Sequence, residues 1–473
     1  MADARATPAV SGGGLVKGLG LLDATTIVMG SMIGSGIFIV SADIARQVGS
    51  PGLLLLVWVV TAVLTLCAAL SYGELAAAMP HAGGKYVYLR EAYGPLTGFL
   101  YGWTLFLVIQ TGTVAAVAVA FAKFTGVLFP AISDANLLLA LGPLRVSTLQ
   151  ALAIAVLVFL TWWNTRGLRY GAILQNVFTI TKTGALLGLI LLGLFLGKRS
   201  GADAVNLEAF WPANLGWWEG LRLVGVATVG SLFASDAWYN VTFTGEEVRN
   251  PKRNLPLALS IGVLSVSALY LATNWVYLRV LPFEAIQNAP ADRVGTAAAE
   301  VLLGPIARQV MAIAIMISTF GCINGLLLAG ARVYYAMSLD GLFFRAVAKI
   351  NPRTASPNAA LVVQCVWASL LCLSGTYNDL LDYVIFAVLL FYAATTSALF
   401  VLRRKRPDME RPYKALGYPV IPGFYTVCAV SIAFLLLIYK PRFTWPGLGL
   451  VLLGVPVYYL WKHYRARVAA SGI

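Results

Sequence analysis

The 473-residue chain is 59% hydrophobic and only 11% charged, with a mean hydropathy of +0.79. Soluble domains carry about 25% charged residues, so this composition excludes an ordinary soluble protein and indicates a chain that lipid surrounds. The net charge of +14 does not indicate nucleic-acid binding, because the basic residues stand in short segments between apolar runs and form no basic face with interleaved aromatic residues.

Apolar runs long enough to cross a bilayer follow one another along the chain and predict an all-α integral membrane protein with about twelve spans. A polar cytoplasmic tail, 1–18, precedes the first span. The first five spans lie near 19–46, 51–79, 95–122, 147–165 and 170–197. The next five lie near 220–247, 254–281, 306–338, 357–375 and 379–402. The last two lie near 416–438 and 444–461, before a second tail, 462–473.

Lysine and arginine concentrate in alternate loops. If the N-terminus is cytoplasmic, the inner loops hold Lys85 and Arg90 first and the cluster Arg403–Arg406 later. Because inner loops of membrane proteins carry an excess of Lys and Arg, the sequence predicts that both termini are cytoplasmic, in a plasma or inner membrane.

Residue types that hold metals or catalyse reactions are scarce. The two histidines, His81 and His463, fall in loops, and the five cysteines fall in apolar runs without paired metal spacing. The sequence therefore predicts no metal site, no cofactor and no enzyme active site.

Two spans carry residues that do not suit a continuous helix: Gly30–Phe38 in the first and Phe233–Trp238 in the sixth. Glycine destabilises a helix interior by about 1 kcal/mol, and lipid cannot satisfy the backbone groups that a break frees, so a break must line a cavity. Close helix packing through small residues is the alternative interpretation. Two breaks five spans apart favour an inverted repeat, in which 19–197 corresponds to 220–402 and 416–461 lies outside the repeat.

Each break exposes N–H groups, which attract anions, and carbonyl groups, which attract cations. A site with both characters suits an α-amino acid zwitterion. We expect the substrate carboxylate at the N–H groups of Ser35, Gly36 and Ile37, beside Gly34. The substrate ammonium is expected at carbonyl groups near the two breaks, those of Ile33, Phe233, Ala234 and Ser235.

Three motifs in chain order carry a family resemblance. Gly34–Phe38 reads GSGIF, Pro80–Tyr88 reads PHAGGKYVY, and Glu246–Pro256 reads EEVRNPKRNLP. They resemble the amino acid–polyamine–organocation superfamily, and the last resembles its L-type amino acid transporter branch. The resemblance implies a LeuT-like fold with a 5+5 inverted repeat, discontinuous helices 1 and 6, and amino acids as substrates.

The same resemblance bears on partners. Animal relatives join an accessory glycoprotein through a cysteine in the loop between spans 3 and 4, but here that loop, 123–147, contains no cysteine. The chain is therefore similar to a prokaryotic, stand-alone member, and we expect a monomer without a disulfide-linked subunit.

Lys182 lies near the centre of span 5, where a cation costs about 2.5–3.5 kcal/mol, so we expect it to face the bundle rather than to snorkel to an interface. In the transporters that this chain resembles, such a lysine takes the place of a sodium ion and bridges spans 1 and 8. That resemblance implies sodium independence and contact with backbone near Gly34 and with the hydroxyl of Ser318. Bonding of Ser318 within its own helix is the alternative.

Three other residues have two interpretations each. By the same resemblance, Phe233 caps the substrate on the outer side and Tyr270 holds its end of the site, whereas packing is the alternative for both. Asp236 either binds a cationic side chain or caps the half-helix that follows the break.

Together these features predict a secondary transporter of neutral L-amino acids that works by alternating access, through sodium-independent exchange or proton-coupled uptake. A transporter of arginine or lysine that uses Asp236 is the alternative. A channel or a substrate-sensing receptor is more remote, because the spans show few polar rings.

Overall fold

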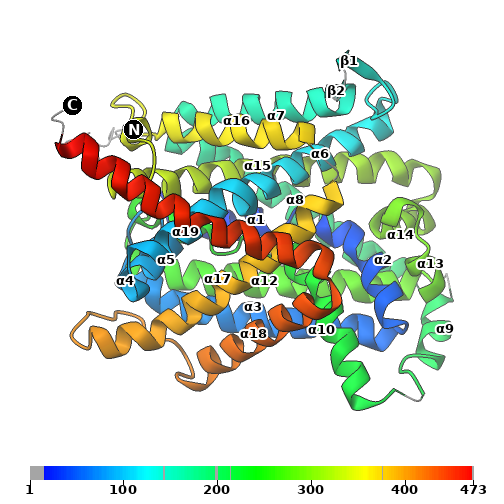
Figure 1. Ribbon diagram of the computed structural model, residues 1–473. Coiled ribbons are helices and arrows are strands. Elements are labelled where there is room, and N and C mark those ends of the chain that lie inside the picture. The colour runs from blue at the N-terminus through cyan, green and yellow to red at the C-terminus, as the bar shows by residue number, and fades with distance from the viewer. Residues whose placement is uncertain (1–14, 142–143, 198–200, 214, 375–376, 471–473) are drawn as a thin grey trace, which may run out of the picture.

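A computed structural model describes residues 15–141, 144–197, 201–213, 215–374 and 377–470 of the chain (Figure 1). Its one sheet is a hairpin of two antiparallel strands, β1 (Leu137–Leu141) and β2 (Leu144–Ser147), in the loop that was expected between spans 3 and 4. The remaining regular structure is helical.

Nine helices or continuous helical runs of the described residues are long and apolar enough to cross a membrane. They are α3 (Pro51–Ala78), the run α5–η1–α6 (Pro95–Leu128), α7 (Thr148–Thr165), α8 (Leu168–Leu196), α12 (Pro251–Val280), the run α14–α15 (Val294–Leu339), α17 (Tyr377–Lys405), α18 (Val420–Tyr439) and α19 (Pro441–Ala470). Within these runs α5 ends at Thr104, the π-helix η1 covers Leu105–Ile109, and α6 begins at Gln110, while α14 ends at Leu303 and α15 begins at Ala307. The prediction of an all-α integral membrane protein is confirmed.

The other predicted spans are interrupted or shorter. Helices α1 (Leu21–Met32) and α2 (Gly36–Val48) are bent by 42° at their junction and count as a tenth span when taken together. Span 6 corresponds to α10 (Trp217–Ala234) with the short α11 (Asn240–Phe243) and η3 (Gly245–Glu247), and span 9 to α16 (Asn358–Ser374). The count of twelve and the inverted symmetry stay predictions.

Short helices connect the long ones. They are α4 (Lys85–Tyr93), α9 (Ala202–Glu208), α13 (Phe283–Gln287), η4 (Pro290–Asp292), η5 (Gly304–Ile306) and η6 (Arg345–Ala348). Of the predicted tails, 1–14 and 471–473 lie outside the described residues, and α19 continues as a helix to Ala470.

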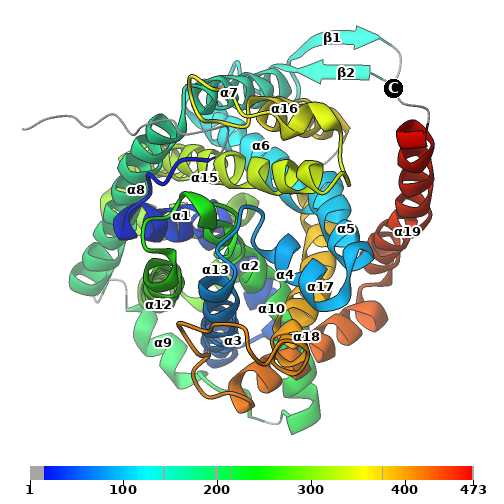
Figure 2. The same ribbon diagram turned by 90° about the vertical axis from the view of Figure 1, so that its left-hand side faces the viewer.

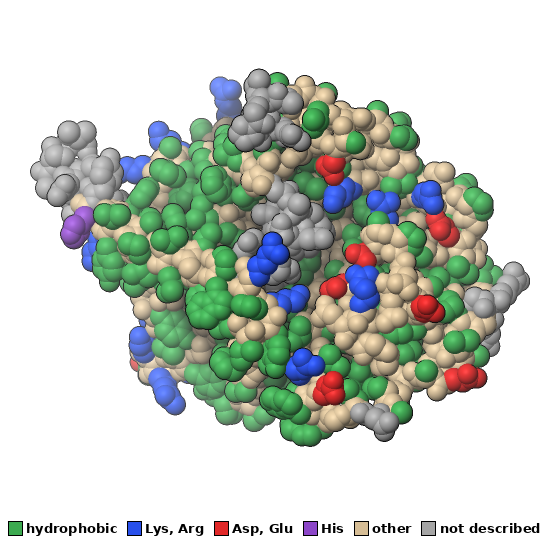
Figure 3. Space-filling view, turned by 45° about the vertical axis from the view of Figure 1, so that its right-hand side comes forward, with side chains coloured by type: hydrophobic (Ala, Val, Ile, Leu, Met, Phe, Trp, Pro, Cys, Tyr) green, Lys and Arg blue, Asp and Glu red, His purple; other side chains and the backbone are tan. Residues whose placement is uncertain are grey.

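Seen from the end of the bundle, α1 lies inside the molecule, among α8, α12 and α15, whereas α18 and α19 lie at its edge (Figure 2). Exposed apolar side chains cover the outer helices; on α8 they include Val177, Ile180 and Leu191. In the view of Figure 3 hydrophobic side chains form a broad area on the left, and the acidic side chains gather on the right. This arrangement gives lipid an apolar exterior and puts the broken helix α1–α2 in the protein interior, as the backbone of a break requires.

Candidate functional site

The first break places backbone carbonyl groups in the middle of the bundle. Helix α1 ends at Met32, and Ile33 is extended, with φ −76° and ψ 96°. The next helix, α2, begins at Gly36. Carbonyl groups at the end of one helix and N–H groups at the start of the next therefore have no partner within their own helices.

Lys182 of α8 reaches this break. Its Nζ donates to the carbonyl oxygens of Gly30 and Ile33, each at 2.6 Å, and to that of Ser318 at 3.3 Å. The side chain is 2% exposed. The ammonium thus lies among three carbonyl oxygens, which is how proteins surround a buried cation.

Ser318 of α15 also contacts the break, and it shares the carbonyl group of Ile33 with Lys182, although its hydroxyl does not contact the ammonium as expected. Its hydroxyl donates to the carbonyl oxygens of Gly34 at 3.0 Å and Ile33 at 3.3 Å, while only its backbone carbonyl accepts from Lys182. A carbonyl oxygen has two lone pairs, so Lys182 and Ser318 together use those of Ile33.

The second break lies against the first. After α10 ends at Ala234, the chain turns through Ala237, whose φ is +65°, before α11 begins. The hydroxyl of Tyr270 on α12 donates to the carbonyl oxygens of Met32 and Ala234, both at 3.1 Å. Tyr270 therefore joins the two breaks by hydrogen bonds.

Gly36 allows this close approach. A Cβ at Gly36 would lie 2.8 Å from the Cβ and 3.0 Å from the Cα of Ala234.

Gly36→Ala should therefore push the two breaks apart and reduce the rate of amino acid transport about tenfold, since overpacking costs roughly 1–3 kcal/mol. Uptake into liposomes measures this effect. Gly188→Ala is the control, because a Cβ at Gly188 of α8 meets no atom within 4 Å; equal rates in the two variants would contradict the prediction.

A small cavity lies between the breaks. Its volume is about 20 Å³, close to the space that one water needs. Of the predicted substrate-binding residues, Gly34, Ser35, Gly36, Phe233, Ala234 and Asp236 line it, and Ile33, Ile37, Ser235 and Tyr270 do not. Its other lining residues are Ser31, Met32, Thr113, Val117, Ala237 and Cys322. The sequence indicated Ser31, Met32 and Ala237 only as parts of the two breaks, and it did not indicate the other three as site residues. An amino acid needs more room, so the breaks must separate when it binds.

Asp236 accepts a hydrogen bond from a tyrosine on a helix that is distant in the sequence. Its Oδ1 accepts a hydrogen bond of 2.5 Å from the hydroxyl of Tyr392 on α17. The residue at the N-terminus of α11 is Tyr239, and no side chain caps this helix. Asp236 therefore does not cap α11 itself, and its carboxylate contacts the hydroxyl of Tyr392 on α17.

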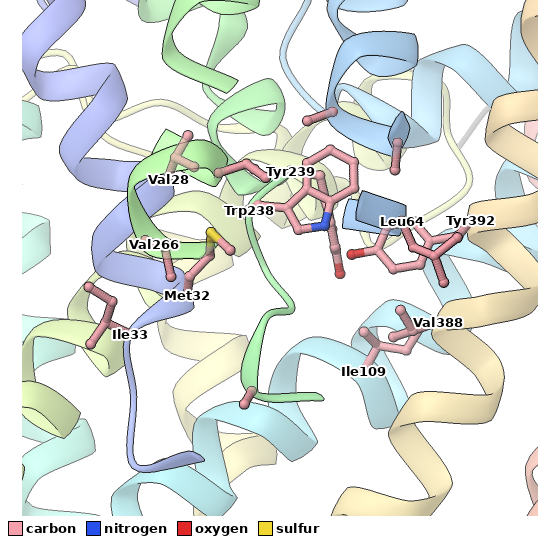
Figure 4. Close-up of a cluster of buried hydrophobic side chains, with 14 of the residues drawn as sticks. Val28, Met32, Ile33, Leu64, Ile109, Trp238, Tyr239, Val266, Val388 and Tyr392 are labelled. Atoms are coloured by element: carbon pink, nitrogen blue, oxygen red, sulfur yellow. The ribbon is translucent and has the colours of Figure 1, made fainter. Parts of the chain in front are cut away.

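Around Asp236 the aromatic rings pack closely. Tyr392 stacks on Trp238 at 5.5 Å between ring centroids and meets Tyr239 edge-on at 5.4 Å. Figure 4 shows Trp238 and Tyr239 on the segment after the break, with Tyr392 facing them from α17. Trp238 thus packs inside the bundle.

Lys85 differs most from its prediction. It was expected as an inner-loop base, but it begins α4 and is fully buried. The preceding Gly83 and Gly84 have φ of +94° and +38°, and a Cβ at Gly84 would lie 2.3 Å from Oγ1 of Thr242. Only glycine fits this turn, which lies against the segment after the second break and directs Lys85 inward.

At the end of the bundle where α1 begins, which we call the α1 end, hydrogen bonds and an ion pair join the start of α1, the segment at Glu247 and α15. The N–H groups of Gly18 and Leu19 donate to the Glu247 carbonyl at 2.9 and 3.0 Å, and that of Arg249 donates to the Leu19 carbonyl at 2.8 Å. The Glu247 carboxylate accepts from Nε and from a terminal nitrogen of Arg332 on α15, at 2.8 and 2.9 Å. Both side chains are buried.

At the same end α4 joins α15. The hydroxyl of Tyr86 donates to Asp340 at 2.6 Å, and Arg90 pairs with the same carboxylate. Burial, and then the neighbouring Asp340, raise the pKa of Tyr86.

The opposite end of the bundle is open. A hollow of about 600 Å³ lies there between α2, α6 and the segment at Asp292 and Arg293.

Comparisons with known proteins identify a family for the whole chain. Residues 19–458 match the family described as amino acid permease. The chain is 33% identical to "Large neutral amino acids transporter small subunit 2" of Mus musculus, over 96% of this chain and 84% of the relative. It is 32% identical to "Asc-type amino acid transporter 1" of Mus musculus, over 96% and 82% of the two chains. It is also 30% identical to "b(0,+)-type amino acid transporter 1" of Homo sapiens, over 95% and 89%.

These relatives are transporters and not enzymes, in agreement with the sequence-based prediction. Two broken helices that meet around a small cavity, with backbone carbonyl and N–H groups at their ends, are an arrangement suited to moving a small zwitterion across a membrane. The chain therefore belongs to the amino acid permease family, in the L-type branch that its motifs predicted, and is a multi-pass membrane transporter of amino acids.

Proposed function

We propose that this protein carries neutral L-amino acids by alternating access without sodium, through exchange or proton-coupled uptake. The observation that supports this most directly is the ammonium of Lys182 among the carbonyl oxygens of Gly30, Ile33 and Ser318. The ammonium of Lys182 already occupies this site. It would repel a sodium ion electrostatically and exclude it sterically. The name of one relative, a transporter of large neutral amino acids, gives further support for amino acids without net charge.

In this proposal the substrate carboxylate binds N–H groups at the start of α2, around Ser35, Gly36 and Ile37. The substrate ammonium binds carbonyl oxygens of the second break, at Phe233, Ala234 or Ser235. Phe233, which lines the small cavity, covers the substrate on its outer side. The carbonyl oxygen of Ile33, which was expected to bind the substrate ammonium, accepts a hydrogen bond from Lys182 instead. Helices α1, α2 and α10 move against the surrounding helices, so that the hollow closes while the contacts at the α1 end open.

The termini and partners follow from the same proposal. The α1 end faces the cytoplasm and the hollow faces outward, which puts both described ends of the chain on the cytoplasmic side.

The segment 123–147 contains none of the five cysteines, which are Cys67, Cys322, Cys365, Cys372 and Cys428. We therefore propose a stand-alone monomer without a disulfide-linked subunit, which non-reducing electrophoresis of the membrane fraction tests.

A transport panel tests the function. We expect purified protein in liposomes to take up at least one labelled neutral L-amino acid at the same rate when potassium replaces sodium. Preloading with unlabelled neutral amino acid, or an inward proton gradient, should raise the rate severalfold. Strict dependence on sodium would contradict sodium independence, and no movement of any labelled L-amino acid under any gradient would contradict transport itself.

The second candidate is a transporter of cationic amino acids, favoured by the position of Asp236 on the cavity wall. The same panel separates the two candidates. Uptake of arginine or lysine well ahead of every neutral amino acid would establish the second candidate, whereas competition mainly by neutral amino acids supports the first.

A further inference from the structure

Lys85 is a buried cation with unusual surroundings. Its side chain is fully buried, and in the described part of the chain its Nζ has no hydrogen-bond partner. Four tyrosine rings surround it, which we call the tyrosine box: Tyr392 at 4.0 Å from Nζ to ring centroid, Tyr239 at 4.3 Å, Tyr101 at 5.2 Å and Tyr72 at 5.8 Å. The box brings together α3, α5, α17 and the segment after the second break.

Aromatic faces stabilise a cation by about 0.5–2 kcal/mol each, whereas removing an ion from water costs several kcal/mol. The box therefore offsets part of the cost of burying Lys85. A nearby negative charge would stabilise the buried ammonium further.

The other buried charges indicate which carboxylate this is. Among the described residues three carboxylates are buried, those of Glu74, Asp236 and Glu247. Glu74 pairs with Arg403 at 2.6 Å and Glu247 with Arg332 at 2.8 Å. Asp236 has no such ion pair in the described part of the chain, so it is the buried carboxylate that remains for Lys85.

Tyr392 connects the two groups. Its ring lies under the ammonium of Lys85, and its hydroxyl donates to the carboxylate of Asp236 at 2.5 Å. The carboxylate lines the cavity between the two breaks, whereas Lys85, whose ammonium lies over the face of the tyrosine ring, is not among the residues that line it. The charge of Asp236 at the cavity is thus opposed by a cation that belongs to the protein.

We propose that Lys85 is a specificity-determining residue, which compensates Asp236 through the tyrosine box and so makes the site favour neutral over cationic amino acids. This inference rests on the proposed function. A cationic substrate side chain would meet Asp236 and the repulsion of Lys85 together, whereas a neutral side chain meets no net charge.

Lys85→Met tests the inference, because methionine keeps the length of the side chain and packs well against aromatic rings. In liposomes, uptake of the labelled neutral amino acid that the wild type moves fastest is measured against rising L-arginine. We expect the half-inhibitory concentration of arginine to fall about tenfold or more relative to that of an unlabelled neutral competitor. Lys85→Met with Asp236→Asn should restore the wild-type ratio, and the exposed Lys252→Met should not alter it.

Asp236→Asn alone gives an independent test if Lys85→Met does not fold. It leaves Lys85 uncompensated, so we expect L-glutamate to become a better competitor and arginine a weaker one. An unchanged arginine-to-neutral ratio in folded Lys85→Met, or unchanged competition by glutamate in Asp236→Asn, would overturn the inference. Wild-type protein that moves no amino acid would overturn the proposed function instead, so the two failures can be told apart.

Discussion

Lys182→Ala is expected to reduce transport about a hundredfold or more while the protein still folds. The substitution removes the ammonium from three carbonyl oxygens, those of Gly30, Ile33 and Ser318, and leaves them buried. Hydrogen bonds to charged groups contribute about 1.5–3 kcal/mol each, and a loss of roughly 3 kcal/mol from the ordered break corresponds to about a hundredfold in rate. Initial rates of uptake into liposomes, with equal amounts of reconstituted protein, measure the effect.

The matched control is Lys252→Ala. Lys252 pairs with Glu410 at 2.7 Å, but both side chains are more than half exposed, so the pair contributes little. We expect this variant to transport at nearly the wild-type rate. If Lys182→Ala matched it, the break between α1 and α2 would not depend on Lys182, and the basis for sodium independence would be lost.

The second large effect is expected from the buried pair of Glu247 and Arg332. Glu247→Gln leaves the guanidinium of Arg332 buried without its carboxylate, and breaking a buried pair in this way costs about 3–5 kcal/mol. We therefore expect a clear fall in the melting temperature of the purified protein in detergent. We also expect the segment at Gly18 and Leu19 to become accessible to a thiol reagent through Leu19→Cys, since it is bonded to Glu247.

Glu410→Gln, at the exposed pair with Lys252, is the stability control and should melt near the wild-type temperature. Replacing both members of the buried pair, in Glu247→Gln with Arg332→Met, should recover part of the loss, because no unpaired charge remains. A single variant as stable as the wild type, or a double variant no better than the single one, would contradict this account.

The sequence predicted the helices and the bend in the first span well because those features depend on local composition. Apolar runs fixed most helix positions within a few residues, and the glycines of 30–36 marked the bend between α1 and α2. Lys182 was expected to face the bundle, since a cation in mid-span has few alternatives. These inferences needed no information about which helices pack together.

The roles of Lys85 and Asp236 could not be predicted in this way. A lysine just after Gly83 and Gly84 has the pattern of an inner-loop base, and only the turn against Thr242 directs it into the bundle. The partner of Asp236 is Tyr392, 156 residues later in the chain. Both depend on contacts between distant segments, on which hydrophobic periodicity carries no information.

The backbone bonds at the α1 end have a consequence for kinetics. Leu19 and Val248 pair as a short parallel bridge, so the start of the first span and the end of the sixth are joined as one unit. Glu247 then attaches this unit to Arg332 of α15. Neither span can swing away from α15 by itself, and a partial displacement would leave a buried charge unpaired. We therefore expect inward opening to be cooperative, so that single molecules switch between two distances at this end and spend little time at intermediate ones.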